Sequence, residues 1–133
     1  MVRTNSLAVM LLLVGIAAVA ALAAVAAEPA SYSRDVEAIF IDRCGDCHSG
    51  DDPKKGLDLS KGTGYTSLVN VKSQETGQLL VTPGEPEASY LWAKLTHTNR
   101  EGKGMPRAIF GSKKLPQAQL DAIRAWIADG ARP

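Results

Sequence analysis

Apolar residues form one continuous run near the N-terminus and two later stretches with helical spacing. The run covers residues 7–27. The first later stretch contains Val36, Ile39, Phe40 and Cys44. The second contains Leu120, Ile123, Trp126 and Ile127. Intervals of three and four residues place side chains on one face of a helix. The pattern therefore predicts a helix from about residue 34 to the first cysteine and a second helix near the C-terminus. We expect the two apolar faces to pack together, with the tryptophan in their shared core.

Residues at the ends of these stretches indicate where the helices begin and end. Ser33 is a candidate N-cap for the first helix. Leu115 and Leu120 stand on either side of Pro116, in the positions of a hydrophobic staple at the start of the last helix. Gly130 is the stop signal for that helix.

The region between the two helices is polar and rich in turn residues. Residues 49–84 contain many Gly, Asp, Ser, Thr and Lys, which predicts loops with one helical turn near residues 65–69. A turn at residues 82–86 leads into a short helix that starts at Pro86 and ends near Leu95 or Thr96. Residues 98–114 are predicted to be a loop. The expected fold class is all-α, with three to four short helices and long loops.

The N-terminal run has the form of a secretory signal. One positive charge precedes it, Ala24-Val25-Ala26 fits a small-residue cleavage site, and Glu28 ends it. An uncleaved membrane anchor is the alternative, because about twenty apolar residues can span a bilayer. The expected organisation is a signal peptide or anchor at residues 1–27 and a single domain at residues 28–133. Either reading places the domain outside the cytoplasm, in the periplasm or another exported location.

Charge and composition narrow the function classes. Residues 28–133 carry all but one of the 15 Lys and Arg residues and all 14 Asp and Glu residues, so the domain is nearly neutral. This balance argues against nucleic acid as a partner. The whole chain has only two Phe, two Trp and three Tyr. A core poor in aromatic residues suggests that a bound group supplies part of it.

Cys44-Gly45-Asp46-Cys47-His48 is a C-x-x-C-H motif, the attachment signature of a c-type haem. In this chemistry the thiols of Cys44 and Cys47 form thioethers with one porphyrin, and His48 supplies an axial nitrogen to the iron. We expect one covalent haem c. A zinc half-site would need further ligands, but the chain has only two cysteines and one other histidine. A thioredoxin-like pair would need a βαβ setting, and a disulfide across so short a loop would stabilise little.

Two residues compete for the other axial position of the iron. Met105 is the only methionine after the N-terminal run, and it lies between Gly104 and Pro106 in a polar loop. The glycine permits a close approach of the backbone, and the proline stiffens the chain. A methionine in such a loop has no evident packing role, although a plain surface position is the simpler alternative. His97 is the rival ligand; near a helix C-terminus, it is also a natural dipole partner. Methionine ligation would raise the reduction potential.

In these motifs the chain resembles small monohaem cytochrome c domains of class I type, and in particular the bacterial subgroup that includes planctomycete-type cytochrome c domains. The resemblance rests on the C-x-x-C-H motif, residues 81–91, residues 104–106 and residues 125–131. It implies the cytochrome c fold around one haem, with His48 and Met105 as axial ligands and one-electron transfer as the activity. Arg107 departs from the Met-Pro-Pro sequence that is commonest in that family.

The expected function is that of an exported electron carrier and not of an enzyme, because two filled axial positions leave no open site on iron. Three alternatives stay open: a haem sensor with a labile methionine bond, a haem peroxidase, and an electron-input subunit of a larger oxidoreductase complex. Redox proteins are the expected partners, and a membrane is expected only if the anchor persists. The docking surface of a partner is expected to be acidic, because five cations surround the methionine loop: Arg100, Lys103, Arg107, Lys113 and Lys114. The simpler reading of these cations is solvated loop charge.

Overall fold

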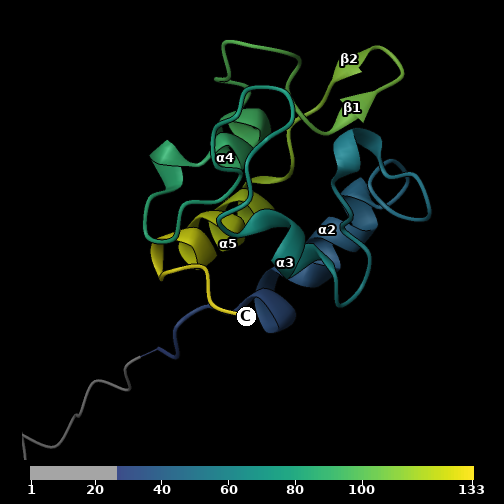
Figure 1. The fold of residues 1–133 in the computed structure, drawn as a ribbon. Coiled ribbons are helices and arrows are strands. Elements are labelled where there is room, and N and C mark those ends of the chain that lie inside the picture. Colours follow the sequence, from purple (N-terminus) through teal and green to yellow (C-terminus); the bar gives the residue numbers. More distant parts are fainter. Residues whose placement is uncertain (1–26) are drawn as a thin grey trace, which may run out of the picture.

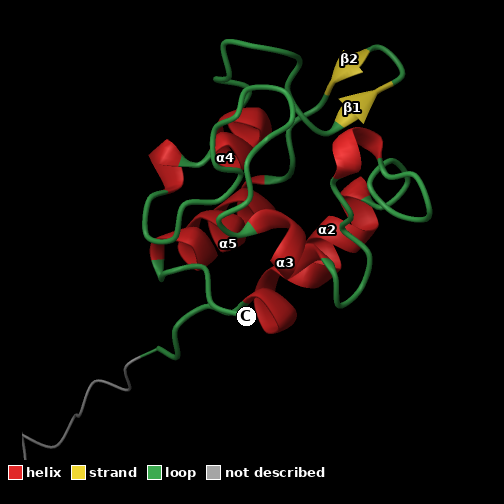
Figure 2. Cartoon of the chain, in the orientation of Figure 1, coloured by secondary structure: helices red, strands yellow, loops and turns green. Residues whose placement is uncertain are grey.

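The computed structural model describes residues 27–133, which fold into short helices joined by long loops (Figures 1 and 2). Four α-helices, two 3-10 turns, one π-helical turn and one hairpin of two-residue strands make up the described part of the chain. The apolar run at residues 7–27, predicted to be a signal or an anchor, lies outside the described residues except for Ala27. Among the described residues no helix is long and apolar enough to cross a membrane.

The predicted first helix is present but begins differently. It consists of a π-helical turn, η1 (Tyr32–Val36), that continues into α2 (Glu37–Cys44). The prediction of Ser33 as N-cap is wrong, because Ser33 lies inside η1 and Ser31 precedes the helix. The side chain of Asp35 determines this start, since its Oδ2 accepts a hydrogen bond of 2.7 Å from the Ser31 backbone N–H. A carboxylate in the first turn thus bonds back to the backbone N–H of the residue that precedes the helix.

The last helix, α5 (Gln117–Ala128), agrees with its prediction. Pro116 precedes its first turn, and Leu115 and Leu120 are both buried, as a hydrophobic staple requires. Gly130 follows the helix at φ +96°, a conformation that side-chain-bearing residues rarely adopt. The sequence signals therefore determine both ends of α5.

The first and last helices pack together through aromatic rings, and this contact forms the core. Phe40 and Trp126 are completely buried, with ring centroids 6.4 Å apart and nearly perpendicular planes. Tyr32 contacts both rings, at 5.9 Å from Phe40 and 5.4 Å from Trp126. Burial of a large apolar side chain is worth about 1.5–3 kcal/mol, so this cluster is a main source of stability. The prediction that Trp126 belongs to the core is confirmed.

The middle of the chain forms loops around two short helices. Helix α3 (Gly64–Leu68) is the turn predicted near residues 65–69. It packs against η1 because Gly64 has no side chain, and the Tyr32 hydroxyl fills that space. A 3-10 turn, η2 (Lys54–Gly56), lies between the C-x-x-C-H motif and α3. Val69 then pairs with Val81 in an isolated bridge, so apolar residues on either side of a polar loop are brought together.

The helix predicted from Pro86 onward is divided into two segments. Pro86 starts the 3-10 turn η3 (Pro86–Ala88), and α4 (Tyr90–Thr96) begins only after Ser89. The side chain of Ser89 explains this break. Its hydroxyl accepts a hydrogen bond of 2.9 Å from the Thr82 N–H and donates one of 2.8 Å to the Glu85 carbonyl. Ser89 itself has an extended backbone, which interrupts the helix, and its side chain holds the preceding turn closed.

The loop predicted at residues 98–114 contains a small hairpin that the sequence did not indicate. Strands β1 (Arg107–Ala108) and β2 (Gly111–Ser112) pair antiparallel around a two-residue turn. Gly111 has φ +94° at the end of that turn, which a glycine tolerates without strain. The fold is therefore mostly helical, as predicted, with one short sheet that an all-α description omits (Figure 2).

Candidate cofactor site

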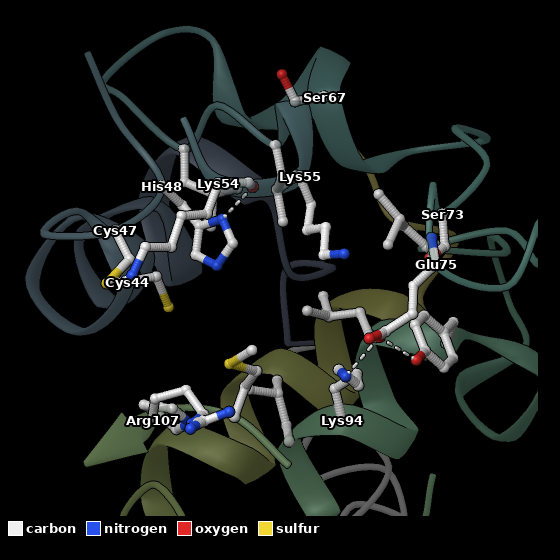
Figure 3. Close-up of a pocket in the computed structure, with 18 of the residues that line it drawn as sticks. Cys44, Cys47, His48, Lys54, Lys55, Ser67, Ser73, Glu75, Lys94 and Arg107 are labelled. Carbon is white, nitrogen blue, oxygen red and sulfur yellow. Dashed lines mark hydrogen bonds and ion pairs between the residues drawn. The ribbon is translucent and has the colours of Figure 1, made fainter. Parts of the chain in front are cut away.

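A cavity of about 640 Å³ is lined by residues from three segments of the chain, 43–59, 67–80 and 90–108 (Figure 3). The C-x-x-C-H motif and η2 form one wall, α4 forms another, and the loop that enters β1 closes a third. The predicted site residues Cys44, Cys47, His48 and Met105 all contribute to the lining. His48 and Met105, which are 57 positions apart in the sequence, thus line the same cavity.

The C-x-x-C-H motif is a turn wound onto the end of α2. The backbone N–H groups of Cys47 and His48 both donate to the Cys44 carbonyl, at 3.1 and 2.9 Å. This turn brings both sulfurs to the same side of the cavity, where Figure 3 shows Cys44 and Cys47 next to each other. Both are free thiols, and burial raises the pKa of Cys44 to about 11. The two thiols are therefore not joined to each other, and the raised pKa keeps Cys44 protonated at neutral pH.

The imidazole of His48 is oriented by a backbone carbonyl. Its Nδ1 lies 3.0 Å from the Lys54 carbonyl oxygen (Figure 3). Because a carbonyl oxygen only accepts, Nδ1 carries the proton in this contact and the lone pair of Nε2 is free. Burial lowers the pKa of His48, which favours the neutral ring. A neutral imidazole with its second nitrogen held by a carbonyl is the usual state of a metal-binding histidine.

Met105 reaches the cavity from the loop that follows α4. Its backbone N–H donates a 2.9 Å hydrogen bond to the carbonyl of Lys94 in α4. Its own carbonyl oxygen lies 3.1 Å from Nε2 of His97. Two backbone contacts thus hold the segment on which the thioether is placed.

His97, the rival candidate for the axial position, does not line the cavity. It caps α4 in the left-handed conformation, with φ 61° and ψ 33°. Its ring packs against Gly104, where an added Cβ would overlap the ring atoms. The structure therefore places His97 behind the methionine loop rather than in the space that a cofactor would fill.

A charge network in the cavity wall, in which a buried lysine pairs with a more exposed glutamate, was missed by the sequence analysis. Lys94 is only 8% exposed, and its Nζ lies 2.7 Å from Oε2 of Glu75. The same oxygen accepts a 2.6 Å hydrogen bond from the Tyr90 hydroxyl. These two donors lower the pKa of Glu75, with Lys94 the larger influence. The available signal was a lysine among the apolar residues of the Tyr90–Leu95 segment, since lysine is rarely buried unless it is paired.

The lining of the cavity fits a haem on chemical grounds. It brings together two thiols, an imidazole nitrogen and a thioether, which are donors typical of c-type haem sites. Apolar side chains provide walls for a flat ring: Leu57, Leu59, Leu80, Leu91 and Leu95. Cationic side chains suit the two carboxylates of a haem: Arg43, Lys55, Lys94 and Arg107. Among the described residues there is no cluster of three or more His, Cys, Asp or Glu that would support the zinc alternative.

The fold and the lining of the cavity together define a small cytochrome c-type domain. Residues 44–108 match the family described as Planctomycete cytochrome C, so this part of the chain is similar to that family. The match contains both the C-x-x-C-H motif and Met105, whereas the packed first and last helices lie largely outside it. This similarity indicates haem binding and suggests haem-based electron transfer. No curated protein and no solved structure gives a significant match to the chain.

Proposed function

We propose that this protein is an exported electron carrier with one covalently attached haem and no enzymatic activity of its own. The observation that supports the proposal best is the convergence of Cys44, Cys47, His48 and Met105 on one cavity. The match of residues 44–108 to a cytochrome c family supports the same class of function.

The side chains would divide the work as follows. Cys44 and Cys47 would attach the porphyrin as thioethers, and the thiol proton of each would be consumed in that addition. His48 would present Nε2 to the iron, because its Nδ1 is engaged by the Lys54 carbonyl. Met105 would supply the second axial ligand from the opposite segment of the lining. When bound, the haem supplies a one-electron Fe(III)/Fe(II) couple.

The support of the methionine loop favours a carrier over a ligand sensor. A sensor needs a methionine that leaves readily, whereas the backbone of Met105 is held on one side by Lys94 and on the other by His97. If His48 and Met105 both stayed on the iron, no position would be open for substrate or gas.

Location and partners extend the proposal. The apolar run at residues 7–27 and the covalent haem both suit a protein that works outside the cytoplasm. We infer that its partners are redox proteins with acidic docking surfaces, since the cations near the methionine loop are all exposed.

Optical and redox titration of the haem-loaded protein, beside Met105→Ala and Cys44→Ser variants, tests the proposal. Met105→Ala should abolish the weak near-infrared absorption that marks a ferric haem with thioether ligation. Its reduction potential should fall by a few tenths of a volt, within the span of about 0.8 V that axial ligands control. Denaturing mass spectrometry should show one haem on the wild-type chain and a weakened attachment in Cys44→Ser. Unchanged spectra and potential in Met105→Ala would exclude Met105 as a ligand.

A further inference from the structure

The turn of the β1–β2 hairpin exposes two large apolar side chains. Ile109 is 94% exposed and Phe110 is 96% exposed. The other exposed large hydrophobic residues of the described chain, Ile41 and Val71, are only 40% and 36% exposed. A single exposed apolar residue needs no explanation, but two adjacent side chains that protrude from a turn favour an interaction site.

Positive charge surrounds this turn. Residues 102–120 contain Lys103, Arg107, Lys113 and Lys114 and no acidic residue. All four cations are exposed. The domain as a whole is nearly neutral. The excess positive charge of this segment is therefore balanced by acidic residues elsewhere in the chain. The hairpin thus presents an apolar tip on a positively charged base.

The hairpin is also joined directly to the cofactor cavity. Arg107 and Ala108 of β1 line the cavity, and Met105 lies two residues before the strand. The base of the hairpin is closed by a 3.1 Å hydrogen bond from the Lys113 N–H to the Pro106 carbonyl. A molecule bound at the hairpin would therefore lie next to the entrance of the candidate haem site.

We propose that the hairpin is the docking element for an acidic redox protein whose surface has an apolar hollow bordered by carboxylates. Ile109 and Phe110 enter the hollow, and the exposed lysines of the segment pair with the acidic border: Lys103, Lys113 and Lys114. This inference rests on the proposed function as an electron carrier. Apolar contact at the centre would contribute affinity, and the surrounding charge would accelerate encounter.

Two other occupants fit the observations less well. In Figure 1 the chain enters the domain at residues 27–31, at the lower left, whereas the hairpin lies at the upper right. An N-terminal membrane anchor would therefore turn the hairpin away from the bilayer. A second copy of this chain would place like charges against one another if the two hairpins met face to face.

Electron exchange with oxidised plastocyanin, a small copper protein with an acidic patch beside an apolar one, provides the test. The haem-loaded protein is first reduced with hydroquinone, a neutral small molecule that requires no docking. The double variant Ile109→Ser/Phe110→Ser should exchange electrons with plastocyanin at least about tenfold more slowly, as expected for loss of a central apolar anchor. Lys114→Glu should slow the exchange several-fold and weaken its dependence on ionic strength. Calorimetric titration with the same copper protein should show matching losses of affinity.

Matched variants separate docking from general effects. Ile41→Ser removes an exposed apolar side chain from α2, and Lys61→Glu makes the same charge change outside the hairpin segment. Both should exchange electrons as the wild type does. Equal rates for hairpin and control variants would overturn the docking proposal, as would a salt-independent rate. So would binding to phosphatidylglycerol vesicles, or self-association in sedimentation, that depends on Phe110. A protein that hydroquinone and dithionite cannot reduce would instead refute the proposed function itself.

Discussion

His97 Nε2 lies 3.1 Å from the carbonyl oxygen of Met105. The residue that competes with Met105 in the sequence therefore supports it in the fold. His97 ends α4, and its ring packs against the methionine loop. It contributes to the site by holding the backbone of Met105 in place. The ligation of iron by His48 and Met105 stays a prediction, but the arrangement makes His97 a positioning residue rather than a rival ligand.

Replacement of His97 by asparagine should loosen the methionine loop without removing a ligand. Asparagine tolerates the left-handed conformation that position 97 adopts, so the end of α4 should be retained. The lost hydrogen bond is worth about 1 kcal/mol. The rate at which imidazole displaces Met105 from the ferric protein should therefore rise several-fold, while the resting spectrum is retained. Arg100→Ala, an exposed change in the same loop, is the control. A resting spectrum altered by His97→Asn would instead indicate that His97 is a ligand.

Gly104→Ala should disturb the same contact from the other side. An added Cβ at position 104 would overlap the imidazole of His97 and displace either the ring or the loop. We expect faster displacement of Met105 by imidazole, together with a stability loss of about 1–3 kcal/mol, typical of overpacking. In the double variant with His97→Asn the smaller side chain relieves the overlap. The two effects should then be less than additive in a double-mutant cycle, and additive effects would contradict the contact.

Glu75→Gln should destabilise the protein in a pH-dependent way. Lys94 and Tyr90 lower the pKa of Glu75 in the folded state below its ordinary value of 4.5. The stabilisation is therefore fully present above the unfolded pKa and is lost as the pH falls through the folded pKa. The variant should be about 1 kcal/mol less stable at pH 7, because solvent screens the charge of the exposed Glu75 carboxylate.

Chemical denaturation at a series of pH values checks this prediction. The difference between wild type and Glu75→Gln should shrink as the pH is lowered below about 4.5. The matched variant is Glu85→Gln, whose side chain forms no hydrogen bond or ion pair within residues 27–133. A difference that stays constant from pH 7 to acid would show that the Glu75 charge does not stabilise the fold.

Trp126→Ala should be the most damaging single change in the core. The side chain is completely buried between the terminal helices, and its indole N–H donates a 2.8 Å hydrogen bond to the Arg132 carbonyl. Removal of so large a buried ring costs about 3–5 kcal/mol. For a small domain this loss should leave much of the population unfolded, as monitored by helical circular dichroism in denaturant. Ile41→Ala on the exposed side of α2 should change the free energy of unfolding by less than about 0.5 kcal/mol.

The elements that could be predicted from the sequence are those with local signals. Helix α5 has an apolar stripe, a staple and a terminal glycine, and all three act within a few residues of the helix. The C-x-x-C-H turn is equally local, because the N–H groups of Cys47 and His48 both donate to the carbonyl of Cys44. These features are determined by neighbouring residues, so no knowledge of the tertiary fold is needed to recognise them.

The features that were missed depend on residues distant in sequence. Lys94 is buried because Glu75, 19 positions earlier, provides a partner. The hairpin at β1 and β2 has strands of two residues, too short for an alternating pattern to be visible. Ser33 is a suitable cap by composition, but the helix begins before it, and Asp35 accepts a hydrogen bond from the N–H of Ser31. Pairing between segments and competition among nearby polar groups therefore limit what the sequence alone predicts.

The two ends of the domain meet. The Tyr32 N–H donates a 2.8 Å hydrogen bond to the Arg132 carbonyl, and Ser31 and Arg132 form a parallel bridge. A short linker could therefore join these ends with little distortion, and the chain could be reopened elsewhere by circular permutation. The turn between Ile109 and Phe110 would be the most informative place for new termini. Such a permutant would keep the helices and the cavity on one continuous chain but would cut the surface that we assign to docking. It would therefore test separately whether the domain folds and whether it recognises a partner.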